Sequence, residues 1–301
     1  MNPGMTTQAP THAREGWVAR DGLRLHYIEW GALSAPTIVA LHGLRSFAYT
    51  WEPVALPLAQ RFRIVALDQR GRGQSDWDPQ RRYYASEYVR DLEALVEHLD
   101  LQRFVLLGHS MGGANAFIYA SRHPDRLAGL VIEDMGPGAS ATSAGADRIR
   151  RELLATPAEF ASWDAAAAFW RRQRPDIPET AVQARVQHSM KALNDGRIVW
   201  RHDAQGIAHA RLHATPQQLV DLWPHVEALE VPTLVLRGAN SDFLSARTAA
   251  EMSQRNAHVL TREVPMASHY VHDDNLPGFE SALHAFLGAP DLATWARGGR
   301  P

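Results

Sequence analysis

The sequence contains no cysteine among its 301 residues. This absence excludes disulfides, thiolate nucleophiles and cysteine-ligated metal sites, and it fits the cytoplasmic location that we expect. No run of 18 or more apolar residues occurs, so we expect neither a membrane-spanning helix nor a membrane partner. The 31 basic and 33 acidic residues nearly cancel, and the net charge of −2 gives no reason to expect a nucleic-acid partner.

Both ends of the chain lack the patterns of regular structure. Residues 1–14 contain no apolar segment of the kind found in signal peptides, and we interpret them as a flexible N-terminal tail. Residues 291–301 are predicted to form a C-terminal tail. The residues between these tails are enough for one large α/β domain with an insertion.

Short apolar runs alternate with helical patterns along most of the chain. A hairpin around Asp21-Gly22 comes first. Runs typical of buried parallel strands then follow at 37–43, 63–68, 104–110, 127–134, 232–240 and 258–265. Strands that alternate with helices predict a mostly parallel sheet with helices on both faces. We assign this core to residues 15–136 and 215–290.

Residues 137–214 interrupt the alternation. They contain no convincing strand and are rich in alanine, arginine and tryptophan, which predicts several inserted helices. An insertion at the carboxyl edge of a parallel sheet would lie over the ligand crevice. We therefore predict a helical cap over residues 137–214.

The clearest chemical signal is Gly108-His109-Ser110-Met111-Gly112, a G-x-S-x-G motif. It follows a buried apolar run and opens a helical pattern, which is the strand–turn–helix setting of a nucleophile elbow. Its glycines permit a sharp turn that lifts the serine hydroxyl above the sheet edge. The alternative interpretation is a glycine-rich turn without chemistry.

Several segments in a fixed order make the sequence resemble the α/β-hydrolase fold superfamily over roughly residues 15–290. They are LHGLRS (41–46), LDQRGRGQSD (67–76), GHSMGG (108–113), LRGANSD (236–242) and ASHYVHDDNLP (267–277). The resemblance implies an α/β-hydrolase fold with an inserted helical cap. It also implies a serine nucleophile followed along the chain by an acid and then a histidine.

The resemblance implies three catalytic residues: Ser110 as nucleophile, Asp242 as acid and His269 as base. A histidine can take and return a proton near neutral pH, and a buried aspartate fixes its tautomer. Asp134, which ends an earlier strand pattern, is the alternative acid. His272 is a less favoured alternative base.

Two backbone amides, those of Leu44 and Met111, are implied as the donors of an oxyanion hole. Arg45 follows the first of them, and either it binds a substrate carboxylate or it is a solvated loop residue. Trp163 and Trp170 either pack the cap or line the substrate pocket.

These features predict an enzyme that cleaves a carboxylic ester or lactone of a small-molecule substrate through an acyl-enzyme on Ser110. Other activities stay open with the same residues: hydrolysis of an amide or of a carbon–carbon bond in a ring-cleavage product, a cofactor-free perhydrolase or haloperoxidase, or a ligand-binding protein without turnover. No cofactor is expected, and no metal, because His269 and His272 lack a third ligand at suitable spacing. The sequence leaves the oligomeric state open.

Overall fold

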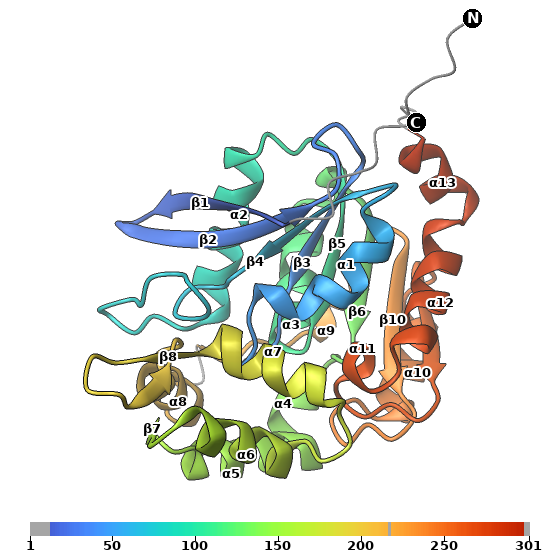
Figure 1. Cartoon of the computed structure of the whole chain (residues 1–301). Coiled ribbons are helices and arrows are strands. Elements are labelled where there is room, and N and C mark those ends of the chain that lie inside the picture. Colours follow the sequence, from blue (N-terminus) through green and yellow to red (C-terminus); the bar gives the residue numbers. More distant parts are fainter. Residues whose placement is uncertain (1–12, 216–217, 298–301) are drawn as a thin grey trace, which may run out of the picture.

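The computed structural model describes residues 13–215 and 218–297. At its centre is an eight-stranded sheet in the order β1-β2-β4-β3-β5-β6-β10-β11 (Figure 1). The strands are β1 (Arg14–Arg20), β2 (Leu23–Trp30), β3 (Thr37–Leu41), β4 (Arg63–Leu67), β5 (Phe104–His109), β6 (Leu127–Glu133), β10 (Thr233–Gly238) and β11 (Val259–Val264). Pairing is antiparallel from β1 to β4 and parallel from β4 to β11, so the predicted mostly parallel sheet is confirmed.

Helices cover both faces of this sheet, because successive strand residues point to opposite faces and both sets are apolar. In β3, for example, Val39 and Leu41 belong to one core cluster, and Ile38 and Ala40 belong to the other. The first cluster is covered by α2 (Ala85–His98), α3 (Met111–Arg122), α9 (Trp223–Glu227) and α10 (Ala246–Arg255). The second is covered by α1 (Glu52–Leu58), α12 (Leu276–Leu287) and α13 (Pro290–Ala296). Shorter elements are η1 (Ala48–Trp51), η2 (Pro124–Arg126) and α11 (Val271–Asp274).

The segment predicted as a cap lies to one side of the sheet, below it in Figure 1. Its helices are α4 (Ala139–Thr142), α5 (Ala144–Ala155), α6 (Trp163–Gln173), α7 (Glu179–Ser189) and α8 (Ala204–Leu212). It also contains a small antiparallel sheet of β7 (Glu159–Phe160), β8 (Met190–Ala192) and β9 (Ile198–Trp200). The expectation of helices alone was therefore wrong, because strands of two or three residues are too short to show an alternating pattern.

Regular structure extends into both segments that we predicted as tails. Arg14 already belongs to β1, and residues 1–12 lie outside the described part of the chain. At the other end, α13 occupies residues that we assigned to a tail, because Leu292 and Trp295 are buried against the second core cluster. No helix in the described ranges is long and apolar enough to cross a membrane.

The turn between β5 and α3 requires glycine on both sides of Ser110. Ser110 occupies this turn with φ 52° and ψ −116°, a conformation that L-residues rarely adopt. A Cβ on Gly108 would lie 2.4 Å from the carbonyl oxygen of Gly112, and a Cβ on Gly112 would lie 2.3 Å from that of Leu41. The strand, the turn and the helix can therefore approach each other only where glycine is present.

We expect Gly108→Ala to destabilise the fold by about 2 kcal/mol or more, because the new methyl group would overlap backbone atoms that cannot move aside. The measurement is urea unfolding followed by tryptophan fluorescence. Gly288→Ala is the matched control, since its φ is −85° and its new Cβ would approach no atom closer than 3.2 Å. Equal stability losses in the two variants would contradict the steric argument.

Candidate active site

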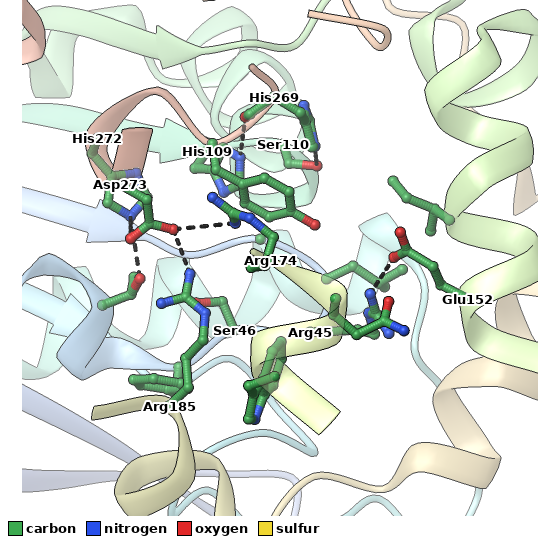
Figure 2. A pocket seen from close by; sticks show the side chains of 18 residues that line it. Arg45, Ser46, His109, Ser110, Glu152, Arg174, Arg185, His269, His272 and Asp273 are labelled. Carbon is green, nitrogen blue, oxygen red and sulfur yellow. Dashed lines mark hydrogen bonds and ion pairs between the residues drawn. The ribbon is translucent and has the colours of Figure 1, made fainter. Parts of the chain in front are cut away.

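Three side chains from distant segments form one hydrogen-bonded series at the carboxyl ends of the strands. Ser110 Oγ lies 2.9 Å from His269 Nε2, and His269 Nδ1 lies 2.8 Å from Asp134 Oδ2. All three residues are almost completely buried. Figure 2 shows Ser110 and His269 side by side in the cavity. Because Nδ1 donates to the carboxylate, Nε2 is left to accept the serine proton.

The acid in this series is Asp134, the alternative, and not Asp242. Gly238 N–H and the Ser241 hydroxyl both donate to Asp134, whose φ of 47° turns its side chain toward them. Asp242 makes no hydrogen bond to His269. Its carboxylate accepts two hydrogen bonds from Arg148, at 2.8 and 2.9 Å.

The physical reason for this correction is that β6 and β10 are neighbours, so acids that follow either strand reach the same edge of the sheet. The loop after β10 uses Ser241 to hold Asp134, and it directs Asp242 toward α5 of the cap. The hydrogen bonds from Arg148 lower the pKa of Asp242, which makes that carboxylate an ion-pair partner.

Glu133, the residue before Asp134, organises the same region, and no sequence motif predicts this role. Its carbonyl oxygen accepts the Ser110 N–H, and its carboxylate accepts the backbone N–H and the Nδ1–H of His272. Burial opposes ionisation of Glu133, but the charge of His272 and these hydrogen bonds outweigh it and lower its pKa. His272 is therefore hydrogen-bonded to Glu133 and forms no hydrogen bond with Ser110. The structure gives no support to His272 as the base. The one available hint was the pair of consecutive acids at the end of a buried strand.

The amides of Leu44 and Met111 are both free to bind an oxyanion, because neither donates a hydrogen bond within the described residues. Gly43 brings the first loop against the nucleophile, since a Cβ there would lie 3.4 Å from the Cβ of Ser110. His42 holds this loop by bonding Gly43 O through Nδ1 and Gln69 N–H through Nε2.

Two cavities meet at Ser110, which lines both. The smaller, of about 50 Å³, is lined by many polar side chains, including Arg45, Glu152, Arg174, Arg185, His272 and Asp273 (Figure 2). The larger, of about 320 Å³, is lined mainly by apolar side chains, including Met111, Ile118, Met135, Ile207, Leu222 and Phe243. Arg72, Arg150 and Arg211 also line the larger cavity. We call the smaller one the polar cavity and the larger, mainly apolar one the apolar cavity, and Ser110 lies between them.

Of the other predicted binding residues, two line a cavity and one does not. Arg45 lines the polar cavity and donates to Thr156 and Glu152 of the cap, so it is not a freely solvated loop residue. Trp170 lines the same cavity and also packs in the core of the cap. Trp163 is 44% exposed and lines neither cavity, because it begins α6 on its outer side. The described residues contain no cluster of three or more potential metal ligands.

Comparison with known proteins agrees with this geometry. Residues 36–276 match the sequence pattern of the alpha/beta hydrolase fold. The chain belongs to this family. The α/β-hydrolase is therefore an enzyme, and the expected fold and class are confirmed.

Relatives of this α/β-hydrolase are hydrolases named for different substrates. It is 29% identical over 240 residues to 2-(acetamidomethylene)succinate hydrolase of Mesorhizobium japonicum, covering 80% of this chain and 84% of that protein. It is 30% identical over 258 residues to 3-hydroxybutyrate-oligomer hydrolase of Cupriavidus necator, covering 82% and 87%. A crystal structure of an α/β-hydrolase from Novosphingobium aromaticivorans is similar with a TM-score of 0.77 and 34% identity, covering 94% and 99%.

Around the site, three buried histidines have pKa values that burial lowers: His42 to about 4, and His109 and His202 to about 3. The unfolded chain takes up these protons near pH 6.5, whereas the folded chain does not until pH is far lower. The unfolded state therefore binds more protons in this window, and the free energy of unfolding falls as pH drops from about 6.5 toward 4.

We expect each of these histidines to contribute up to about 1.4 kcal/mol per pH unit in that window. Urea unfolding at pH 7, 6 and 5 measures the slope. His202→Phe removes one titrating ring that packs against Trp200. The free energy of unfolding should then depend less steeply on pH, by the contribution of one histidine. An unchanged slope in His202→Phe would show that His202 does not titrate as proposed.

Proposed function

We propose that this α/β-hydrolase cleaves a carboxylic ester or lactone through an acyl-enzyme on Ser110. The observation that carries this proposal is the hydrogen-bonded series from Ser110 Oγ through His269 to Asp134, beside the free amides of Leu44 and Met111. This arrangement contains a nucleophile, a base with a fixed tautomer and two donors for a developing oxyanion.

In the first half-reaction, Ser110 Oγ attacks the carbonyl carbon while His269 Nε2 takes the hydroxyl proton. The negative charge that develops on the carbonyl oxygen is bound by the amides of Leu44 and Met111. His269 then gives its proton to the departing alcohol as the carbon–oxygen bond breaks. In the second half-reaction, His269 takes a proton from water as the water oxygen attacks the acyl carbon. His269 then gives this proton to Ser110 Oγ as the carbon–oxygen bond to the serine breaks and the carboxylic acid leaves.

Asp134 has the role of the acid in this scheme. Its carboxylate holds the Nδ1–H of His269 and stabilises the imidazolium that forms during each half-reaction. It is itself held by hydrogen bonds from Gly238 and Ser241, which keep its orientation fixed. Asp242 lies on the cap side and helps to attach α5 through Arg148.

Relatives support an ester as the substrate. They include an oligomer hydrolase of 3-hydroxybutyrate and an esterase from Mycobacterium tuberculosis that is 29% identical over 77% of this chain. The apolar cavity beside Ser110 offers space for an acyl or alcohol group.

We expect Ser110→Ala to reduce kcat for 4-nitrophenyl butyrate by roughly 10⁴- to 10⁶-fold, because the variant cannot form the acyl-enzyme. A fluorophosphonate probe should label the wild-type protein at Ser110 and leave the variant unlabelled. Ser121→Ala, which alters a serine at the far end of α3, is the matched control and should keep full activity. Undiminished turnover in Ser110→Ala would refute the proposal.

We expect Asp134→Asn to lower kcat by about 10³- to 10⁴-fold, because an amide cannot hold His269 in the required tautomer. Asp242→Asn should change kcat by less than roughly tenfold, since it weakens only a part-exposed ion pair. Ester hydrolysis by both variants, alongside thermal unfolding, provides the measurement. A larger loss in Asp242→Asn than in Asp134→Asn would reverse the assignment.

A further inference from the structure

We propose that the polar cavity beside Ser110 binds an anionic group of the substrate, a carboxylate, while the apolar cavity takes the uncharged half. This inference rests on the proposed function and specifies its substrate class: an ester that carries a free carboxylate a few atoms from the scissile bond. The decisive feature is that three arginines, Arg45, Arg174 and Arg185, line this one cavity with the nucleophile.

The three arginines come from separate elements and converge on the cavity, as Figure 2 shows. Arg45 follows the candidate oxyanion loop, Arg174 follows α6, and Arg185 lies within α7. Such convergence of charged side chains in a confined space is costly unless partners of opposite charge are present. Here each arginine has such a partner: Glu152 for Arg45, Asp274 for Arg174, and Asp273 for Arg185.

Each of the three guanidinium groups has an N–H group that donates no hydrogen bond within the described residues. Arg45 uses its two terminal nitrogens for Thr156 and Glu152, and Arg185 uses its own for Ala181 O and Asp273. The Nε–H groups of these two arginines and of Arg174 donate to no acceptor within the described residues, and none of the three nitrogens is fully buried. They are therefore available to a planar carboxylate, which guanidinium groups bind with good geometry.

Each carboxylate near these arginines is shared with a second donor. Among the described residues, Glu152 and Asp273 are the acids that line the cavity, and Glu152 also pairs with Arg148. Asp273 is shared by Arg174 and Arg185. Asp274, which pairs with Arg174, also accepts hydrogen bonds from the backbone and hydroxyl of Ser268 and does not line the cavity.

The size of the cavity is consistent with such a ligand. The volume of about 50 Å³ is small and suits a compact group such as a carboxylate better than a long chain.

The carboxylate can belong to either half of the ester, and two pairs of substrates separate these cases. For the acyl half, we compare 4-nitrophenyl hydrogen glutarate with its methyl ester. For the alcohol half, we compare 3-(butyryloxy)butanoic acid with its methyl ester. We expect the wild-type enzyme to prefer the acid in one pair by about tenfold or more in kcat/KM, and this preference to shrink as ionic strength rises.

Arg185→Gln is the test variant, and Arg171→Gln is its control. Arg171 lies on α6, is about half exposed and pairs with Glu179, away from the cavity. We expect Arg185→Gln to raise KM for the acid substrate by about tenfold, while kcat for the acid and kcat/KM for the methyl ester stay near wild type. Arg45→Gln provides an independent second variant, and thermal unfolding checks that each variant is folded.

Two results would overturn the inference while leaving the proposed function intact. One is a wild-type enzyme that cleaves the methyl esters as well as or better than the acids. The other is an equal loss on acid and methyl ester in both arginine variants, which would mean that the arginines only attach the cap. Failure of the proposed function is distinct, because Ser110 would then not react with the fluorophosphonate at all.

Discussion

Two consecutive carboxylates at the end of β6 hold together the segments that form the site. Glu133 accepts the backbone N–H of Ser110 through its carbonyl and anchors His272 through its side chain, while Asp134 holds His269. Both carboxylates are completely buried, so they depend on their full set of hydrogen-bond donors. Successive residues point to opposite sides of the chain, which lets one dipeptide serve two histidines. The elbow and the loop that contains His269 and His272 are thereby both held by hydrogen bonds to Glu133 and Asp134.

The same arrangement gives the buried histidines near Ser110 different pKa values. Burial holds His109 and His42 neutral, and each uses its ring nitrogens to bind a backbone group. The Glu133 carboxylate outweighs burial at His272 and raises the pKa of that ring. Of these three histidines, only His272, which has a carboxylate partner, has a raised pKa. The region next to Ser110 therefore has a defined electrostatic pattern before any substrate arrives.

The cap contacts the core through apolar packing and through ion pairs. Ala146 and Ile149 of α5 pack in the first core cluster, whereas the cluster around Trp170 belongs to the cap alone. Ion pairs cross from the cap to the loops beside the nucleophile: Arg148 to Asp242, Arg174 to Asp274, Arg185 to Asp273 and Glu152 to Arg45. Because the last three pairs each place at least one residue in the lining of the polar cavity, residues that attach the cap also set the chemistry of the space over Ser110.

Local features of the sequence, apolar runs and a glycine-bounded turn, were enough to predict the parallel sheet and the elbow at Ser110, and the family resemblance implied His269 in the loop after the last strand. The identity of the acid depended on the tertiary structure. Asp134 and Asp242 follow adjacent strands and reach the same edge, and only the turn at Ser241 and the partner Arg148 distinguish them. Convergence of Arg45, Arg174 and Arg185 on one cavity likewise depended on long-range packing, since no local pattern connects residues 140 positions apart.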